Sequence, residues 1–410
     1  MKKLVVFGAG KIGRSFIGQL FARSGFEVVF ADIARQVVSE LNNRKTYPVV
    51  IKSAGADEIL KVENVRGVLI DEVDKVAGEV SDCDIAAVSV GQKGLPQAVA
   101  ILAEGLKLRR KRFGNKPLDI ILAENLRNAD QYVRGILQKI LGKEYPLDEL
   151  IGLVETSIGK MVPIMPQEIQ EKDCLLVYAE PYNTLILDKK AFKNPIPDIR
   201  GLAPKDNMKA WVDRKSHIHN FGHAAAAYAG FLAEPRAIYL ADVLENKAVK
   251  KFARSAMLQS AVVLMRKYPG EFTATDLTDH VDDLLFRFGN RALGDTVFRV
   301  GCDLQRKLHR NDRILSPLID GLKLKSPVNK ILLTFAYGLF FRARDENGKL
   351  LPGDAEFSRI LNKKGLIYVL NHFCGLHPKV DREVMQRILS ANWDVSPLKM
   401  KLGNLFSPKK

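Results

Sequence analysis

Residues 4–33 read LVVFGAGKIGRSFIGQLFARSGFEVVFADI, and this stretch decides the fold of the first half of the chain. A short apolar run (4–7) ends at glycines, a segment with helical spacing follows, and a second apolar run (27–33) contains an acid near its end. Apolar runs without polar alternation are typical of parallel strands that are covered on both faces. The stretch therefore predicts a strand, a tight turn, a helix and a second, parallel strand.

The alternation of strands and helices continues through the first half of the chain. Further apolar runs occupy 84–91 and 118–125, and helix-like segments separate them. This order predicts an α/β, doubly wound, Rossmann-like domain, to which we assign residues 1–193. The runs GLVETSIGKMVP (152–163) and LLVYAEPYNTLILD (175–188) are interpreted as further strands of the same sheet.

A proline-rich stretch, NPIPDIRGLAP (194–204), marks a change in character. Beyond it, nearly all apolar positions follow helical spacing, for example over 206–232, 237–267 and 328–344. We therefore predict a mainly α-helical second domain over 194–410. A chain of 410 residues is long enough for two hydrophobic cores, which agrees with this division.

The composition indicates a globular protein of the cytoplasm. Hydrophobic residues make up 47% of the chain and charged residues 27%, and no stretch is long and apolar enough to span a bilayer. The apolar run at the start is too short for a secretory signal peptide. The four cysteines are scattered without a CxxC pair, which argues against a disulfide framework or a zinc ribbon.

The net charge of +16 indicates an anionic partner, which could be nucleic acid, anionic lipid or a small anionic substrate. The densest basic run is LKLRRKRFGNK (106–116). The chain has no recognisable nucleic-acid motif, such as an RNP sequence or paired zinc ligands. We therefore favour a small anionic molecule, and we expect no membrane partner.

The glycines of GAGKIG have the G-x-G-x-x-G spacing, directly after a predicted strand and at the start of a predicted helix. In this position backbone N–H groups and the helix dipole can bind a pyrophosphate. Gly8 permits the turn, Gly10 lets the ligand approach, and Gly13 lets the helix pack on the strand. The turn expected to bind a dinucleotide comprises Gly8, Ala9, Gly10, Lys11, Ile12 and Gly13.

Asp32 ends the strand that follows this helix, where its carboxylate can accept hydrogen bonds from the ribose hydroxyls of adenosine. A carboxylate there repels a 2′-phosphate, so we predict NAD as the cofactor, with Arg35 as the one nearby group that would suit NADP. Val90 and Gly91, at the end of the third apolar run, are expected to line the same site.

A second informative stretch is RKSHIHNFGHAAAAYAG (214–230). If residues 213–229 form an α-helix with about 100° per residue, Lys215 and His223 lie about 80° apart and can face one cleft together with Asn220. Alcohol oxidation needs a base for the hydroxyl proton and neutral donors that hold the oxygen. A lysine can be this base if burial or a neighbouring cation lowers its pKa.

Two alternatives to this interpretation exist. His219 and His223 have the spacing of a zinc-binding helix, but Asn220 stands where the HExxH motif carries its glutamate, so we predict no metal. The basic groups could also merely cap a surface helix. Such groups are favoured near the C-terminal end of a helix, however, whereas these lie near its start.

Four stretches together resemble the polyol-specific long-chain dehydrogenases/reductases, the mannitol dehydrogenase family. They are FGAGKIGRSFIGQLFARSGFEVVFAD (7–32), AENLRNAD (123–130), VDRKSHIHNFGHAAAAYAG (212–230) and RFGNRALGDTVFRVGCDLQRKL (287–308). The family's Lys-x4-Asn-x2-His signature is specific, and it corresponds here to Lys215, Asn220 and His223. The resemblance implies that Lys215 is the general base of a metal-independent reaction and that His223 orients the substrate. It further implies that Asn220 and Asn125 stabilise the oxyanion.

The resemblance also implies substrate contacts for Arg299 and Lys307. Arg306, beside Lys307, would suit a phosphate because guanidinium groups bind phosphate through paired hydrogen bonds. The alternative for these three residues is an ordinary solvated basic face. Two positions depart from the family: Gly159 and Lys160 stand where an Asp-Arg pair is usual, and Lys11 stands where this branch tends to have asparagine.

The implied activity is the NAD-dependent interconversion of mannitol 1-phosphate and fructose 6-phosphate. The positive net charge would steer such a doubly anionic substrate. The departure at Gly159 leaves the particular substrate open, so a related enzyme of a non-phosphorylated polyol or a hexuronate is the nearest alternative. More distant alternatives are an NAD-responsive nucleic-acid-binding protein and a dinucleotide-binding protein whose catalytic residues have decayed.

Overall fold

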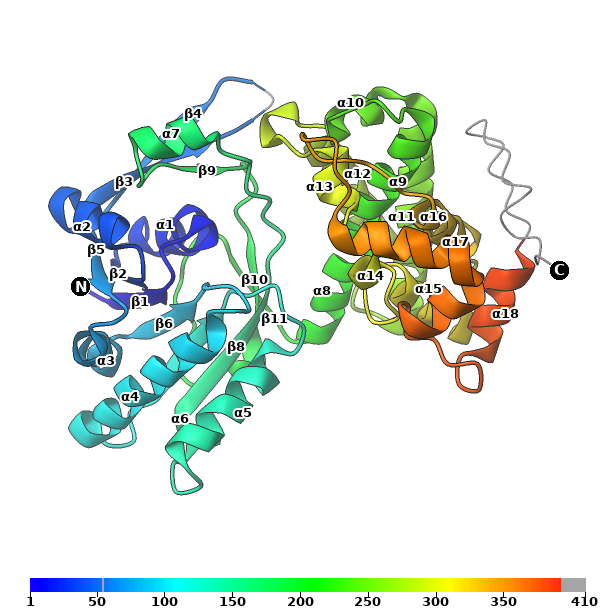
Figure 1. Ribbon diagram of the computed structural model, residues 1–410. Coiled ribbons are helices and arrows are strands. Elements are labelled where there is room, and N and C mark those ends of the chain that lie inside the picture. Colours follow the sequence, from blue (N-terminus) through cyan, green and yellow to red (C-terminus); the bar gives the residue numbers. More distant parts are fainter. Residues whose placement is uncertain (54, 392–410) are drawn as a thin grey trace. The chain divides into compact units, whose positions relative to one another are not determined.

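The computed structural model describes residues 1–53 and 55–391; the end of the predicted second domain, 392–410, lies outside the described residues. The chain divides into two compact units, Met1–Val212 and Asp213–Lys410, and each is described by itself (Figure 1). The division falls later than the boundary we placed after residue 193. Residues 194–212 join the first unit because β11 (Leu202–Lys205) pairs with β10 (Leu185–Asp188).

The first unit contains an eight-stranded sheet with the order β11-β10-β8-β7-β6-β1-β2-β5. The strands not yet given are β1 (Lys3–Phe7), β2 (Glu27–Asp32), β5 (Val65–Leu69), β6 (Ile85–Val88), β7 (Leu118–Leu122) and β8 (Ile151–Ser157). All neighbours are parallel except β8 and β10. The predicted Rossmann-like fold is thus confirmed.

Both faces of this sheet are covered, as the uninterrupted apolar runs predict. Leu4 and Val6 of β1 belong to one buried hydrophobic cluster, and Val5 and Phe7 belong to another on the opposite face. The helices of the unit are α1 (Gln19–Ala22), α2 (Arg35–Arg44), α3 (Val73–Asp82), α4 (Leu95–Phe113), α5 (Ala129–Leu141), α6 (Leu147–Leu150) and α7 (Gln167–Lys172). Crossovers through such helices keep the strands parallel.

A smaller sheet of the same unit was not anticipated from the sequence. It has the order β4-β3-β9, from β3 (Thr46–Ile51), β4 (Glu58–Glu63) and β9 (Val177–Ala179). The run 175–188 therefore supplies strands to two sheets: β9 pairs with β3, and only β10 extends the large sheet. Pro181, which has no N–H for a ladder, lies between the two strands.

The second unit is mainly helical, as predicted. Its helices after residue 220 are α9 (Phe221–Ala233), α10 (Leu240–Glu245), α11 (Lys247–Lys267), α12 (Ala274–Phe288), α13 (Val297–Gly301), α14 (Leu304–Lys307), α15 (Leu315–Lys323), α16 (Asn329–Leu339), α17 (Pro352–His372) and α18 (Arg382–Ser390). Helix α9 is buried along nearly its whole length and packs against α10, α11, α13 and α16. Its small residues allow this: a Cβ on Gly222 would lie 2.4 Å from the Met257 sulfur.

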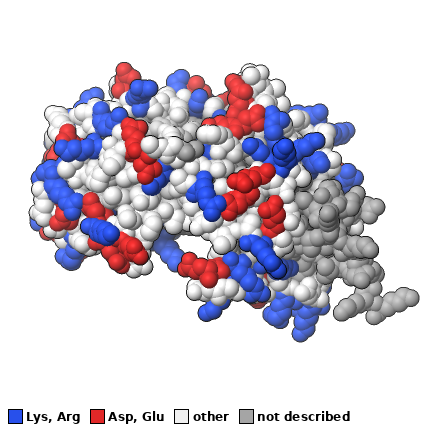
Figure 2. All heavy atoms as spheres, turned by 90° about the horizontal axis from the view of Figure 1, so that it is seen from above, with Lys and Arg blue, Asp and Glu red and all other residues white. Residues whose placement is uncertain are grey.

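The charged side chains form no purely basic surface on the face seen in Figure 2, where acidic groups lie among the basic ones. Several basic side chains of the run 106–116 form hydrogen bonds within the protein. Arg109 is buried and donates to the carbonyl oxygens of Ser81 and Cys83, and Arg112 donates to the Ser81 hydroxyl. None of the helices in the described residues is long and apolar enough to cross a membrane.

Candidate functional site

The glycine turn lies where β1, β2 and β6 end. Because β1 pairs in parallel with both neighbours, Phe7 is level with Ala31 and Val88, so the segments that follow these strands share one edge of the sheet. Gly8 has a φ of +98°, and a Cβ there would lie 2.6 Å from the Ser89 carbonyl oxygen. A Cβ on Gly13 would lie 2.0 Å from the Gly8 oxygen, whereas one on Gly10 would meet nothing within 4 Å. The turn itself requires Gly8 and Gly13, and the space at Gly10 is open to a ligand.

Asp32 is tied to this turn by two backbone hydrogen bonds. Its Oδ2 accepts from the Ala9 N–H at 2.6 Å, and its Oδ1 accepts from the Ala34 N–H at 2.8 Å. Each carboxylate oxygen can accept a further hydrogen bond, so capacity remains for ribose hydroxyls. Arg35, the cation that would suit a 2′-phosphate, pairs instead with Asp71 at 2.5 Å.

The other residues predicted to bind the cofactor lie around this turn. Lys11 is exposed, Ile12 and Val90 are half-buried, and Gly91 donates its N–H to Oε1 of Glu124 at 2.9 Å. Burial raises the pKa of Glu124 above its usual range. Glu124 was not predicted from the sequence, although it immediately precedes Asn125.

Arg14 was also missed. It follows the motif directly and is buried, with its Nε donating to the Ala9 carbonyl at 2.6 Å and its Nη1 to that of Cys174 at 2.8 Å. A buried cation thus fixes the position of the Ala9 carbonyl in the middle of the glycine turn. No sequence signal separates this arginine from an exposed one, because its partner Cys174 lies on a distant segment.

Asn125 is exposed and follows β7 in the first unit, whereas the other predicted catalytic residues belong to the second. Lys160, which replaces a usual family residue, is buried in the first unit. Its ammonium donates to the carbonyl oxygens of Glu180 and Tyr182 and to Oδ1 of Asn183, at 2.8–3.1 Å. Lys160 therefore anchors the segment before β10. A Cβ on Gly159 would make only an ordinary contact, 3.5 Å from the Tyr182 ring.

The predicted catalytic residues of the second unit lie around a π-helical turn, not a regular α-helix. Between α8 (Met208–Arg214) and α9, residues Lys215–Asn220 form this turn, and the Phe221 N–H donates to the carbonyl oxygens of Ser216 and Ile218. The prediction of an uninterrupted α-helix over 213–229 is therefore wrong here. A π turn contains one residue more than an α turn, which changes the angle between Lys215 and His223 from about 80° to about 20°.

The π turn leaves the His217 carbonyl oxygen without its α-helical hydrogen bond, and a side chain from another helix replaces it. In an α-helix the His217 carbonyl oxygen would accept from the Phe221 N–H. Here it accepts from the Ser260 hydroxyl of α11, at 2.6 Å, and both groups are buried. The His217 ring itself lies with its Nε2 3.1 Å from the Ser316 hydroxyl. Contacts from distant helices therefore hold the turn.

We expect Ser260→Ala to lower kcat/KM about tenfold, because the π turn that orients Lys215 would lose a buried hydrogen bond. The free energy of unfolding should fall by about 1 kcal/mol. Ser255→Ala is the matched control, since this half-buried serine on the same helix donates only to the Lys251 carbonyl. A Ser260→Ala protein that is destabilised but fully active would show that the turn does not depend on this bond.

The environment of Lys215 suits a base. Burial lowers the pKa of its ammonium to about 8, and repulsion by the Arg313 guanidinium acts in the same direction. Arg313 is well buried and paired with Asp312 at 2.7 Å. Arg313 was not predicted from the sequence, because its approach to Lys215 is a tertiary contact between segments far apart in the chain.

His223 is held by Asp295, another residue that was missed. The Nε2 of His223 lies 3.2 Å from Oδ2 of Asp295, within ion-pair distance, and neither atom has a hydrogen-bond partner among the described residues. The ring also stacks on Phe288, with centroids 4.3 Å apart. Burial lowers the pKa of His223 more than Asp295 raises it, so the imidazole is neutral near pH 7. Because a carboxylate only accepts, Nε2 carries the proton and Nδ1 is an acceptor.

Asp295 joins two residues that were predicted separately. Its Oδ1 accepts from the Arg299 guanidinium, one helical turn further on. Burial acts to raise the pKa of Asp295, but His223 and Arg299 together outweigh it and hold this pKa below its usual value. The predicted substrate residue Arg299 and the predicted catalytic residue His223 therefore share one buried carboxylate.

The other two predicted substrate residues differ in their surroundings. Lys307 is buried and donates to the Val300 carbonyl at 2.5 Å, and its pKa is lowered to about 8, first by burial and then by Arg313. Arg306 is half exposed and pairs with Asp303 and Asp312. The structure thus brings Lys215 and Lys307 near the same arginine, while Arg306 is engaged by carboxylates.

Among the described residues, Asp213, His217 and Asp320 place possible metal-ligating atoms within 4.8 Å of one another. The Lys267 ammonium pairs with both carboxylates, at 2.8 Å from Asp213 and 2.6 Å from Asp320. The Tyr268 hydroxyl also donates to Asp213, at 2.7 Å. A protein cation thus already neutralises this acidic pair, which is a poor arrangement for a metal.

Both units match known families. The mannitol dehydrogenase Rossmann domain matches residues 2–201, and the mannitol dehydrogenase C-terminal domain matches residues 207–367. A curated relative, mannitol-1-phosphate 5-dehydrogenase of Buchnera aphidicola subsp. Acyrthosiphon pisum (strain Tuc7), is 28% identical over 392 residues, which are 95% of this chain and 98% of that protein. The same enzyme of strain APS gives the same figures.

Two solved structures share the fold. D-sorbitol dehydrogenase in its substrate-free form has a TM-score of 0.73 at 18% identity, over 86% of this chain and 84% of that one. Mannitol 2-dehydrogenase of Pseudomonas fluorescens, solved with NAD and D-mannitol, has a TM-score of 0.71 at 15% identity, over 97% and 94%. At such identities the likeness is one of fold.

Proposed function

The chain belongs to the mannitol dehydrogenase family, and we propose that it interconverts mannitol 1-phosphate and fructose 6-phosphate. The observation that carries this proposal is Lys215: a lysine whose pKa is lowered to about 8, on a π turn that brings it towards the same helix face as His223. Perturbed ionisable groups and π turns both occur preferentially at functional sites. The order of the family signature identifies Asn220 as the third member.

The cofactor is NAD. The open space at Gly10 and the remaining acceptor capacity of Asp32 fit a dinucleotide, with Val90 and Gly91 beside them. When bound, NAD supplies the acceptor for the hydride that leaves the carbinol carbon. The chain's own residues must then handle the proton and the charge on the oxygen.

The family signature assigns the proton chemistry mainly to residues of the second unit. The neutral amine of Lys215 removes the hydroxyl proton of the polyol. The amides of Asn220 and Asn125 donate hydrogen bonds to the oxygen as negative charge develops on it. His223, with its proton on Nε2 towards Asp295, offers Nδ1 to a substrate hydroxyl. None of these roles requires a metal.

A phosphorylated substrate is favoured by the positive potential near the base. Arg313 lowers the pKa of both Lys215 and Lys307, so three cationic groups lie near one another. Asp312, which pairs with Arg313, compensates only part of this charge. An anionic substrate relieves this repulsion when it binds. The curated relatives are named as enzymes of mannitol 1-phosphate. A non-phosphorylated polyol remains the second candidate because Arg299 and Arg306 are already paired with carboxylates.

The direct test is NADH oxidation, followed by absorbance, with fructose 6-phosphate, fructose, tagaturonate and fructuronate as separate substrates. We expect turnover with fructose 6-phosphate and a kcat/KM at least 100-fold lower with fructose, since a paired phosphate contact is lost. Equal turnover of fructose would retain the mechanism and reject the phosphorylated substrate. Failure with all four ketoses, in a protein that still binds NADH, would reject the proposed activity.

The pH dependence of polyol oxidation should report the amine of Lys215. Its deprotonated form is active, so kcat/KM should rise with pH through a pKa near 8. In Arg313→Gln the repulsion that favours the neutral amine is lost, so this pKa should rise by roughly one unit and the rate at pH 7.5 should fall. Arg359→Gln, on the exposed side of α17, is the control. An unchanged profile in Arg313→Gln would show that the group titrating near pH 8 is not Lys215.

We place the protein in the cytoplasm. All four cysteines are free thiols, and two of them, Cys83 and Cys374, are buried. Burial raises the pKa of both thiols to about 12, which keeps them protonated and unreactive. Thiols of this kind suit a reducing compartment.

A further inference from the structure

A hollow of about 570 Å³ in the first unit is not used by the proposed reaction. It lies beside α1, which continues the π turn Gly13–Gly18 (η1), and beside the segments that lead into β10 and β11. Its polar lining consists of Gln19, Arg23, Ser24, Asn183, Thr184 and Arg200. The volume is in the range of sites for small metabolites.

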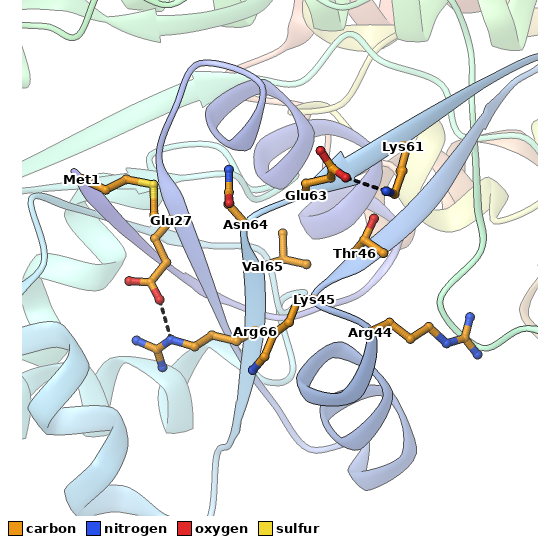
Figure 3. A pocket seen from close by; sticks show the side chains of 10 residues that line it. All are labelled: Met1, Glu27, Arg44, Lys45, Thr46, Lys61, Glu63, Asn64, Val65 and Arg66. Carbon is orange, nitrogen blue, oxygen red and sulfur yellow. Dashed lines mark hydrogen bonds and ion pairs between the residues drawn. The ribbon is translucent and has the colours of Figure 1, made fainter.

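The charge of this hollow is uniformly positive. Arg23 and Arg200 line it without any carboxylate, and in the described chain neither guanidinium makes a hydrogen bond or an ion pair. A hollow of about 550 Å³ at the amino ends of β2 and β5 differs in this respect. There Glu27 pairs with Arg66 and Glu63 with Lys61, as Figure 3 shows. Unpaired guanidinium groups are the preferred partners of phosphate.

Gln19 adds a second, independent observation. Its residue is 1% exposed, and its Oε1 has no hydrogen-bond partner. The orientation of the amide is fixed, because Nε2 donates to the Ser15 carbonyl at 3.1 Å and to Oδ1 of Asn183 at 2.6 Å. The Asn183 oxygen accepts from Lys160 as well, which leaves its own amide N–H groups as donors. A buried acceptor of this kind requires a donor, such as a ligand hydroxyl.

We propose that this hollow binds a small phosphate ester that carries hydroxyl groups, with Arg23 and Arg200 on the phosphate and Gln19 accepting from a hydroxyl. The site is separate from the open space at Gly10, because Gln19 lies beyond the end of η1. Gly201 makes the enclosure possible: with φ at +106°, a Cβ there would lie 2.7 Å from the Asn183 carbonyl and 2.9 Å from Leu20. No step of the proposed reaction depends on this site.

The test uses the full chain and glycerol 3-phosphate as the probe. Arginine modification by phenylglyoxal, followed by peptide mass spectrometry, gives a rate for each arginine. Saturating glycerol 3-phosphate should slow the modification of Arg23 and Arg200 at least fivefold and leave Arg110 and Arg112 unchanged. Those two arginines line none of the hollows described in the first unit and serve as internal controls.

Affinity is measured by calorimetry in the Arg23→Gln/Arg200→Gln protein and in an Arg110→Gln/Arg112→Gln control with the same loss of charge. We expect at least tenfold weaker binding in the first and unchanged binding in the second. Unprotected Arg23 and Arg200 would overturn the proposal, and so would equal affinity in both variants. Inorganic phosphate that protects as well as glycerol 3-phosphate would overturn the role of Gln19. Because none of these readouts is turnover, failure here is distinguishable from failure of the proposed activity.

Discussion

Replacing Lys215 by methionine is expected to lower kcat by roughly 10²- to 10⁴-fold in both directions, the usual contribution of a general acid–base group. Methionine has similar length and no ionisable nitrogen, so the hydroxyl proton has no acceptor at the position where the amine has its lowered pKa. The site is desolvated, which a thioether tolerates at little cost in folding free energy. The measurement is steady-state NADH oxidation with fructose 6-phosphate.

Two controls make this result specific. Lys209→Met changes an exposed lysine of α8 and should leave kcat within twofold of the unmodified protein. NADH affinity, measured by fluorescence, should be the same in both variants, since the glycine turn and Asp32 belong to the first unit. If Lys215→Met keeps a tenth of the activity or more, another group is the base.

Replacing Asp295 by asparagine should lower kcat/KM by about 10- to 100-fold, the usual cost of removing a buried group that orients a functional histidine. The amide is isosteric, but it cannot attract both the His223 ring and the Arg299 guanidinium as the carboxylate does. His223 could then carry its proton on either nitrogen, and only one arrangement presents Nδ1 as an acceptor.

The positioning role of Asp295 is separated from a structural role by two readouts. The loss in Asp295→Asn should be mainly in kcat, while the thermal unfolding midpoint should change by only a few degrees. Asp283→Asn, which removes a half-exposed partner of Arg287, is the control. A large fall in the unfolding midpoint with an unchanged kcat would contradict the assignment.

The parts that could be predicted from the sequence are those encoded locally. The glycine motif, the acid at the end of β2 and the apolar runs identify the Rossmann-like unit because each signal lies within a few residues. The helical second unit follows from periodicity in the same way. The site residues themselves remain predictions, and the resemblance to a family contributed Asn125, Arg299 and Lys307, which no local pattern indicates.

The parts that could not be predicted depend on contacts between distant segments. Asp295 and Arg313 act on His223 and Lys215 from the loops before α13 and α15, and nothing in their own sequence neighbourhood distinguishes them from surface charges. The π turn was missed for the same reason, since Ser260 of α11 accounts for it. Helical periodicity predicts that a segment is helical, but it does not show one extra residue within a turn.

The extra residue in Lys215–Asn220 determines how this part of the chain can change in length. Deletion of one residue there would restore a regular α-helix, with an ordinary backbone hydrogen bond in place of the one from Ser260. The same deletion would keep Lys215 about 20° from His223, because seven residues at about 100° each give the angle that the π turn gives now. Related proteins that keep the activity can therefore lose the extra residue, provided that the side chain removed is not one that the reaction uses.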